Sequence, residues 1–502
     1  MTTELPPAGT VHPASVARWT DRKRYLWLIG LVAPSLTGIA LLGWSLTGKG
    51  LWLWAGPIFV FGIVPLLDLV MGLDPSNPPD EVIEALENDR YYRWVTYAYI
   101  PLQYAGFLAG MWVIATKDLG PLGTIGLSIT IGLVGGIGIN TAHELGHKRP
   151  EHERWLAKIA LAQTAYGHFF IEHNRGHHVR VATAEDPASA RFGEHLYEFW
   201  WRTVLGSARS AWRLEKRRLA RSGQHPWRLS NDNLNAWLMT VVLWAGLLLW
   251  LGWRIVPALL LQAVVGILLL EVVNYLEHYG MLRQQIRRGD RLVYERVDPR
   301  HSWNSNNLVT NLLLYHLQRH SDHHAHPVRR YQVLRHYEES PALPTGYAGM
   351  ILLALLPPVW RRVMDRRVLA HAGGDLSRVN LHPRARARMA VTGTSVGPVE
   401  PGGPGSAVEV SASAASAGVG APVVAARCPG CGYRYDVAQG DPREGLPAGT
   451  PWSRVDPDLE CPDCGVRTAG EFVLERLGRP KEPGDSLRPL RPGCAAPPHR
   501  AR

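Results

Sequence analysis

The sequence predicts a mainly α-helical membrane protein. We expect a six-transmembrane-helix bundle with a histidine-rich cytoplasmic region, followed by a small, β-rich, cysteine-bearing domain. Three observations lead to this fold class. The apolar residues are concentrated in six long blocks, histidines gather in three short clusters beside those blocks, and all five cysteines lie at or beyond position 428. A chain of 502 residues is long enough for more than one domain.

Six segments are apolar and long enough to cross about 30 Å of hydrocarbon. They cover residues 25–47, 51–72, 94–115, 121–142, 235–253 and 255–277. The connections within successive pairs are too short to be domains, so we expect three helical hairpins. The apolar run Met350–Trp360 is shorter and ends at Pro357-Pro358. It is more typical of a packed or interfacial helix than of a seventh span.

Every long charged segment then falls on one side of the membrane. Residues 143–234 contain 15 Lys/Arg and 10 Asp/Glu, so the positive-inside rule places this side, with both termini, in the cytoplasm. Residues 1–24 lack the apolar core of a cleavable signal peptide. The same rule accounts for the net charge of +11. No recognition motif accompanies the basic residues, so we expect no nucleic-acid partner.

The histidine clusters have the spacing of metal ligands. An imidazole offers one lone pair to a metal, and histidines three or four residues apart share a helical face. The eight clustered histidines exceed the needs of one ion, which predicts two metals. A ninth ligand, His278, is expected at the cytoplasmic end of the sixth span. The clusters are His143-Glu144-Leu145-Gly146-His147, Glu172-His173-Asn174-Arg175-Gly176-His177-His178 and His320-Ser321-Asp322-His323-His324.

Carboxylates accompany these histidines. We expect them to accept the second N–H of a ligating imidazole, which fixes its tautomer. These acids are Glu144, Glu172, Glu277 and Asp322. Isolated histidines are expected to be surface, helix-capping or supporting groups; they are His152, His168, His195, His301, His316 and His326.

Two other functions fit part of the pattern. The first cluster matches the H-E-x-x-H of zinc proteases, with Glu144 as the base. A zinc protease needs one further ligand and leaves the other clusters unexplained. A membrane protein that stores or senses metal without turnover would explain the histidines but would not need an electron carrier.

Residues 25–340 resemble the membrane alkane 1-monooxygenases, a family within the wider integral-membrane desaturases and hydroxylases. The histidine boxes alone mark the wider group, and three longer motifs carry the narrower resemblance: Asn274–Gly280, Leu317–Ala325 and Ala184–Ser189. The resemblance implies a di-iron centre held by nine histidines. They map onto His143, His147, His173, His177, His178, His278, His320, His323 and His324.

The same resemblance implies an activity. We expect terminal hydroxylation of a linear alkane with O₂, and a fatty-acid desaturase or hydroxylase of the same group is the alternative. An apolar channel between the spans would take substrate from membrane lipid. Chain-length preference would depend on bulky residues near 52–54 and 59–61. The implied location is the bacterial inner membrane.

The cysteines predict a second metal site. Cys428-x-x-Cys431 and Cys461-x-x-Cys464 suit either a zinc ribbon or a rubredoxin, since both use tetrahedral sulfur ligation. The residues around and between the cysteines resemble rubredoxin, which implies one iron held by four thiolates. Leu459, Thr468 and Trp452 depart from the usual pattern in the small aromatic core. Cys494 is expected to be an ordinary exposed thiol.

We therefore expect five parts: a cytoplasmic N-terminal segment (1–24), a transmembrane di-iron domain (25–384), a flexible linker (385–427), a rubredoxin domain (428–475) and a disordered tail (476–502). The rubredoxin segment carries nine Asp/Glu and four Arg. This negative charge complements the basic cytoplasmic face. A linker of this length has a root-mean-square reach of about 35 Å. No dinucleotide-binding fingerprint is present, so a separate NAD(P)H-dependent flavin reductase is the expected electron source.

Overall fold

The computed structural model describes residues 19–288, 291–391 and 422–477. Within these ranges, six helical segments are long and apolar enough to cross a membrane, and each matches one predicted span. The predicted mainly helical fold class is therefore confirmed. The segments are Leu26–Thr47, Gly50–Met71, Arg90–Thr116, Gly120–Gly146, Asp232–Leu251 and Trp253–His278.

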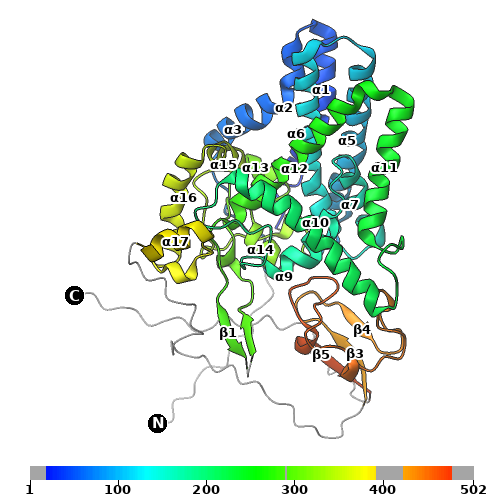
Figure 1. Cartoon of the computed structure of the whole chain (residues 1–502), viewed down its shortest axis with the longest axis vertical. Helices are drawn as coiled ribbons and strands as arrows, with labels where there is room; N and C mark the ends of the chain where they lie inside the picture. The colour runs from blue at the N-terminus through cyan, green and yellow to red at the C-terminus, as the bar shows by residue number, and fades with distance from the viewer. Residues whose placement is uncertain (1–18, 289–290, 392–421, 478–502) are drawn as a thin grey trace, which may run out of the picture.

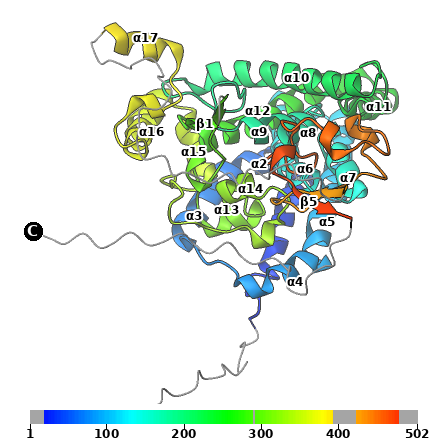
Figure 2. The same ribbon diagram turned by 90° about the horizontal axis from the view of Figure 1, so that it is seen from below.

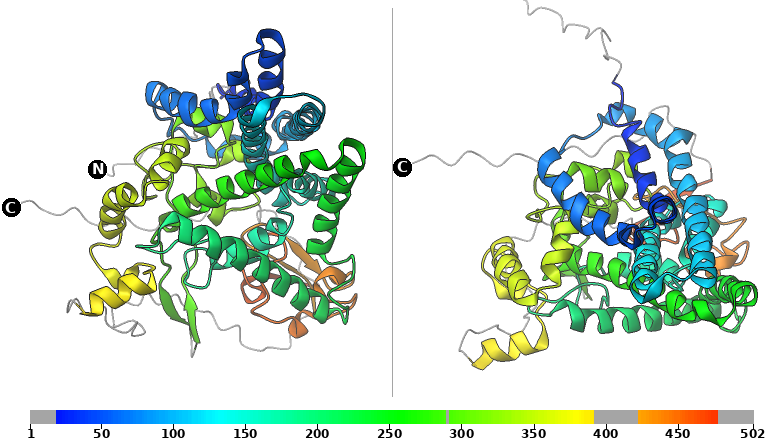
Figure 3. Two further views of the ribbon diagram at one scale, coloured as in Figure 1. Left: turned by 45° about the horizontal axis from the view of Figure 1, so that its top comes forward. Right: turned by 90° about the horizontal axis from the view of Figure 1, so that it is seen from above.

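The spans stand together at the top of Figure 1. Span one contains α1 (Val32–Thr47), and span two contains α2 (Ala55–Pro57), a π-helical segment (Ile58–Ile63) and α3 (Val64–Met71). The other spans are α5 (Arg90–Thr116), α6 (Gly120–Gly146), α11 (Asp232–Leu251) and α12 (Val256–His278, after a 3-10 turn). Seen from above in Figure 3, α11 stands at the edge of the bundle.

The two helices α6 and α12 approach each other closely because glycines line their contact. A Cβ at Gly132 would lie 2.7 Å from the carbonyl oxygen of Gln262, and one at Gly136 would lie 2.9 Å from that of Gly266. Small residues are the usual means of close helix packing in membranes. The pairing brings the C-terminal ends of both helices, Gly146 and His278, to the same side of the bundle. We call this the histidine side.

The remaining helices of the large domain gather on the histidine side (Figure 2). The long helix α10 runs along the outer edge of the molecule in Figures 2 and 3. Its bounds are Leu196–Arg221. The other elements are α4 (Ile83–Asn88), α7 (Glu151–Ala162), α8 (Phe169–Ile171), the π-helix η5 (Glu172–His177), α9 (His178–Arg180), β1 (Gln285–Arg288), β2 (Arg291–Tyr294), α13 (Leu308–Leu313), α14 (His320–Ala325), α15 (Tyr347–Ala354), α16 (Pro357–His371) and α17 (Pro383–Val391).

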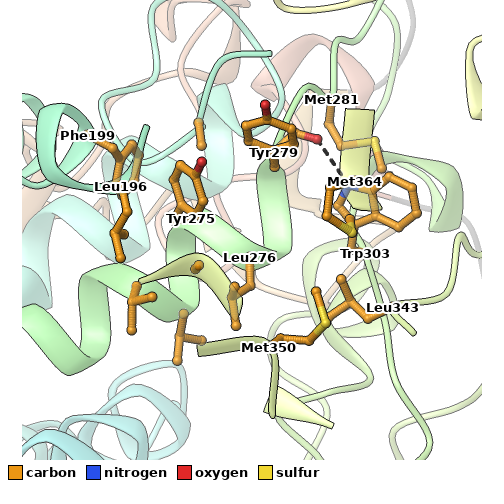
Figure 4. Close-up of a cluster of buried hydrophobic side chains, with 14 of the residues drawn as sticks. Leu196, Phe199, Tyr275, Leu276, Tyr279, Met281, Trp303, Leu343, Met350 and Met364 are labelled. Atoms are coloured by element: carbon orange, nitrogen blue, oxygen red, sulfur yellow. Dashed lines mark hydrogen bonds between the residues drawn. The ribbon is translucent and has the colours of Figure 1, made fainter. Parts of the chain in front are cut away.

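A buried aromatic cluster anchors the last turns of α12 (Figure 4). The indole of Trp303 donates to the carbonyl of Tyr279 at 3.0 Å, and Trp360 of α16 packs on the rings of Tyr275 and Tyr279. The apolar run around residue 350 is thus a packed helix, as expected. Its predicted end is wrong: the paired prolines begin α16, because a proline at the first position of a helix loses no hydrogen bond.

The C-terminal domain is a three-stranded antiparallel sheet in the order β4-β3-β5. Its strands are β3 (Val423–Arg427), β4 (Arg434–Asp436) and β5 (Val473–Arg476). Trp452, one of the noted departures, lies 5.3 Å from the ring centroids of both Tyr435 and Phe472, so it fills the small aromatic core.

The ends of the predicted linker are regular structure. The helix α17 covers residues 383–391 and the strand β3 covers 423–427, so both neighbouring domains extend into the predicted range 385–427. The strand β5 likewise passes the predicted end of its domain by one residue. The middle of the linker, most of the predicted N-terminal segment and almost all of the predicted tail, with Cys494, lie outside the described residues.

Candidate metal centres

All nine predicted histidines converge in two buried groups. In each group the candidate ligand nitrogens lie within 4.8 Å of one another. The first group has five members: His143, His147, His173, His178 and His323. The second has four: His177, His278, His320 and His324.

Four pieces of chain bring these side chains together. The last turn of α6 carries His143, and His147 follows as its C-cap. His278 is the last residue of α12. The short helix α14 gives one histidine to the first group and two, four residues apart, to the second. The fourth piece is the π-helix η5 with α9.

The π-helix decides how its histidines are divided. Its i→i+5 hydrogen bonds bring residues five apart onto one face, so His173 and His178 join the same group. His177 faces the other group. The α-helical spacing in the sequence pairs His173 with His177, and the structure separates them. A π-helical turn is a common feature of functional sites.

The crowding of nitrogens fits a pair of bound cations. The Nε2 atoms of His143 and His323 are 2.8 Å apart, and those of His324 and His320 are 2.9 Å apart. The Nε2 atoms of His147 and His177 are buried without a hydrogen-bond partner. A neutral imidazole has only one N–H, so facing nitrogens leave lone pairs that need a positive charge. Imidazole donors of this kind suit zinc, copper, nickel or iron.

The predicted carboxylates differ in their contacts. Glu277 accepts from the hydroxyl of Tyr347 at 2.7 Å, and its other oxygen lies 3.1 Å from Nε2 of His320. That nitrogen also faces His278 and His324, so Glu277 lies at the second group itself.

The other three acids make their hydrogen bonds and ion pairs elsewhere. Glu144 pairs with Lys148 at 3.1 Å, Glu172 with Arg180 at 2.7 Å, and Asp322 with Arg329 at 2.8 Å. Burial raises the pKa of Glu172 to about 8, although Arg180 opposes the shift. The structure thus differs from the expectation that these three support ligating histidines, because neighbouring cations compete for them.

Asp186 makes the contact that we expected of those acids. Its carboxylate lies 2.8 Å from Nδ1 of His177 and accepts from the hydroxyl of Ser189 at 2.6 Å. Burial opposes its ionisation, but His177 and Ser189 hold the pKa of Asp186 well below its usual value. The sequence contains a signal for this residue, since Asp186 lies in the motif Ala184–Ser189, but the motif alone does not show its partner.

The isolated histidines lie outside both groups. His195 caps α10 by accepting from the backbone N–H of Glu198 at 3.1 Å, as expected of a helix-capping group. His326 contacts Asp322, and His152 contacts the hydroxyl of Tyr97. His168 is buried against Tyr166, and burial lowers its pKa to about 4.

The four cysteines form a third group of compatible size. The Sγ atoms of Cys428 and Cys464 are 3.9 Å apart, and those of Cys431 and Cys461 are 3.6 Å apart. A tetrahedron with metal–sulfur bonds of about 2.3 Å has edges of roughly 3.8 Å, so a metal ion fits among them. After each pair a glycine takes a left-handed turn, with φ of 74° at Gly432 and 64° at Gly465.

This domain lies against the histidine side of the large domain, with its cysteine loops in the contact. Glu444 is buried between Arg175 at 2.6 Å and Arg221 at 2.9 Å. Asp463 lies 3.1 Å from Arg149 and 3.0 Å from Arg154. The acids come from the small domain and the arginines from the large one, as the predicted charge complementarity requires.

One cysteine loop reaches the backbone beside a metal-site histidine. A Cβ at Gly465 would lie 3.1 Å from the carbonyl oxygen of Asn174 and 3.8 Å from Cβ of His178. Only a glycine permits this approach without displacement of the neighbouring chain.

An apolar cavity of about 70 Å³ lies among the spans next to the histidines. Asn140 lines it one turn before His143, and Leu317 lines it three residues before His320. Val60 of the second span and Leu269 of α12 are further lining residues. Tyr347 also lines it and donates to Glu277. The cavity can hold a hydrocarbon close to the second histidine group.

Comparison with known proteins agrees with this geometry. The chain is 45% identical to alkane 1-monooxygenase 1 of Alcanivorax borkumensis over 368 residues, which are 73% of this chain and 90% of that protein. It is 44% identical to the alkane 1-monooxygenase of Pseudomonas putida, over 74% of this chain and 92% of that protein. The chain belongs to the alkane 1-monooxygenase family.

The remaining matches fix the wider group and the second domain. The fatty acid desaturase profile matches residues 119–354, and the rubredoxin profile matches residues 425–472. The xylene/toluene monooxygenase hydroxylase component XylM of Pseudomonas putida is 26% identical over 65% of this chain and 85% of that protein. This family member is thus a multi-pass membrane monooxygenase with a C-terminal rubredoxin domain, and non-haem iron is the metal of both regions.

Replacement of Asp186 by Asn should weaken the second histidine group. The amide cannot hold Nδ1 of His177 as a carboxylate does, and loss of such a partner lowers metal affinity or activity by about 10–100-fold. Iron content per chain and hydroxylation rate measure the effect. Glu185→Gln, which changes the adjacent acid, should leave both unchanged. Equal iron and rate in the two variants would show that Asp186 does not support this site.

Proposed function

We propose that the protein inserts one oxygen atom of O₂ into the terminal C–H bond of a linear alkane, giving a primary alcohol and water. Two protons and two electrons complete the balance. The observation that carries this proposal is the apolar cavity lined by residues one turn before His143 and His320, in a chain of the alkane 1-monooxygenase family.

The nine histidines are the proposed iron ligands, five for one ion and four for the other. Bound iron would supply the activation of O₂ and the oxidation of the C–H bond. The protein supplies position and environment. Asp186 holds the ring of His177 through a hydrogen bond. The short, buried helix α14 carries three of the histidines and fixes their positions. Burial of the whole set keeps bulk water away from the reacting groups.

The apolar cavity determines which carbon reacts. Its walls offer almost no polar atoms, so a hydrocarbon chain can enter but gains no fixed polar contact along its length. Asn140 and Leu317 line the cavity one turn before His143 and His320, so a chain that meets this wall with one end would present its terminal carbon to the histidine groups. The hydroxyl of Tyr347 already donates a hydrogen bond to Glu277, so it needs no water molecule in the cavity as a partner.

The docked rubredoxin domain is the proposed electron donor. The loop that holds Cys461 and Cys464 meets the carbonyl of Asn174 and Cβ of His178 through Gly465, so this contact offers a direct route for electrons into the first histidine group. Electrons would reach the rubredoxin iron one at a time from a separate NAD(P)H-dependent flavin reductase. The tether 392–421 keeps the carrier at high effective concentration.

The proposed setting is the inner membrane of a bacterium, with the histidine side, the rubredoxin domain and both termini in the cytoplasm. The excess of Lys and Arg on that side supports this orientation. The proposed domain order is the hydroxylase, a linker and the rubredoxin, with boundaries moved to the observed ends of α17 and β3.

The function is tested by feeding octane or hexadecane to cells that hold the full chain and a working rubredoxin reductase. We expect 1-alkanols from the wild type. His320→Ala should abolish the product and lower the iron content, because it removes a donor from the second group, while membrane insertion stays intact. Product at the wild-type rate from His320→Ala would contradict the ligand assignment, and absence of 1-alkanol from the wild type would contradict the function.

Chain-length preference should depend on Val60. This side chain is buried at the cavity, and Phe in its place would shorten the space open to substrate. Overpacking of 1–3 kcal/mol corresponds to a fall of about tenfold in hexadecane turnover relative to octane. Val70→Phe is the matched control, because Val70 is 79% exposed in the same span. An unchanged ratio in Val60→Phe would place the substrate elsewhere.

Docking should depend on Glu444. Burial opposes its ionisation, but Arg175 and Arg221 lower the pKa of Glu444 to about 2. The interaction is therefore present above the ordinary carboxyl pKa and is lost only as the pH falls toward 2, so salt rather than pH should weaken it near neutrality.

The variant Glu444→Gln should weaken docking by about 1–3 kcal/mol, since it removes the charge of a buried acid that pairs with two partly exposed arginines. Reductase-driven turnover should fall, and its salt dependence should flatten. Glu475→Gln removes an acid that pairs with Arg434 within the small domain and should change neither quantity. If both variants turn over alike at every ionic strength, the docked geometry is not the productive one.

A further inference from the structure

A second, polar cavity of about 270 Å³ lies between α10 and the loop after α9. Four arginines line it: Arg180, Arg209, Arg213 and Arg217. One acid, Glu185, also lines it, and it accepts from the hydroxyl of Tyr294 at 2.9 Å. Within residues 19–288, 291–391 and 422–477, no acid forms an ion pair with Arg209, Arg213 or Arg217. The cavity therefore has an excess of positive charge that no acid among the described residues neutralises.

Arg180 is fixed in the wall of this cavity. Its Nη2 donates to Glu172 at 2.7 Å and to the hydroxyl of Ser210 at 2.7 Å. Its Nε is buried and has no hydrogen-bond partner. A guanidinium held on one edge and unsatisfied on another is a prepared donor for an anion, and its planar fork matches phosphate oxygens.

The helix α10 places this cavity at the boundary of the membrane. The hydroxyl of Thr203 donates to Glu271 in the last third of α12 at 2.8 Å, and the amide of Asn233 at the start of α11 donates to the carbonyl of Ala211 at 2.9 Å. So α10 runs along the ends of two spans, at the outer edge of the molecule in Figure 2. Trp201 is 75% exposed two turns before Arg209, as is typical of side chains at the lipid–water interface.

The neighbouring acids of the rubredoxin domain are already paired. Glu444 is held by Arg175 and Arg221, and Asp463 by Arg149 and Arg154. The arginines of the cavity form none of these ion pairs, although Arg217 also lines the space between the two domains with Glu444 and Glu460. An alkane carries no charge to match them, so the site serves neither the substrate nor the docking contacts already described.

We propose that this cavity binds the phosphate of an anionic phospholipid from the leaflet on the histidine side. The acyl chains would lie outward beside Trp201 and Leu205, both of which are exposed on α10. The two non-bridging oxygens of a phosphodiester can accept hydrogen bonds from Arg209 and Arg213, which lie one turn apart. They can also accept one from the free Nε of Arg180. The lipid would then fasten α10 to the membrane beside the docked rubredoxin.

The test is native mass spectrometry of the full chain in detergent, titrated with phosphatidylglycerol. We expect the wild type to retain one lipid specifically. Arg209→Gln/Arg213→Gln should bind it about 30-fold more weakly, as the loss of two cations near a phosphate predicts. Arg362→Gln/Arg366→Gln is the matched control, because it removes two exposed arginines at the same spacing on α16, and it should retain lipid like the wild type.

Three comparisons separate a lipid site from other results. Phosphatidylcholine carries the same phosphate beside a quaternary ammonium that the arginines repel, so the wild type should retain it more weakly than phosphatidylglycerol. Inorganic phosphate lacks acyl chains and should compete poorly. Equal phosphatidylglycerol retention by the wild type and Arg209→Gln/Arg213→Gln would overturn the proposal. So would displacement of the lipid by inorganic phosphate at comparable concentration, which would indicate a site for a soluble phosphate. If the double variant does not fold, Arg209→Gln alone provides the comparison, with an expected loss of affinity of about fivefold.

Discussion

The burial of nine imidazoles at one end of a helical bundle is the constraint on which the rest of the structure depends. Buried nitrogens without partners are costly, and nine of them facing one another require bound cations. The fold must therefore bring four histidine-bearing segments together at the same end of the bundle. The glycine contact between α6 and α12 does this for two of them, since it sets the ends of both helices side by side. The aromatic cluster around Tyr275 and Trp360 then holds the end of α12 in place.

This arrangement also explains why the site has two faces. Toward the spans, the histidines meet an apolar cavity that only a hydrocarbon would occupy without penalty. Away from the spans, they meet arginines and the acidic rubredoxin domain. Substrate and electrons would thus approach from opposite directions and would not compete for the same surface. The separation follows from the position of the site at the boundary between lipid and water.

Charge is used at three distances from the metal groups. Asp186 contacts the buried His177 through a direct hydrogen bond. Glu444 and Asp463 of the rubredoxin domain form ion pairs with arginines of the large domain and so join the two domains. Arg209, Arg213 and Arg217 of α10 line the polar cavity, and none of them forms an ion pair with an acid among the described residues. Screening by salt should affect the contacts between domains far more than the buried Asp186 contact.

The sequence by itself determined the six spans, the nine candidate ligands and the four cysteines, because apolar length and ligand spacing are local properties. It also determined the opposite charges of the two domains. Only the tertiary structure decided how the histidines divide, since that depends on the π-helix at Glu172–His177, and an α-helical spacing pairs His173 with the wrong neighbour.

The carboxylates show the same limit. Glu144, Glu172 and Asp322 stand next to histidines in the chain but pair with Lys148, Arg180 and Arg329, whereas Asp186 contacts His177 from nine residues away. Adjacency in sequence does not predict a hydrogen bond, because side-chain direction and competing cations are set by the packed fold. The docked position of Gly465 beside His178 and the arginine cavity on α10 are long-range contacts, and no local pattern encodes them.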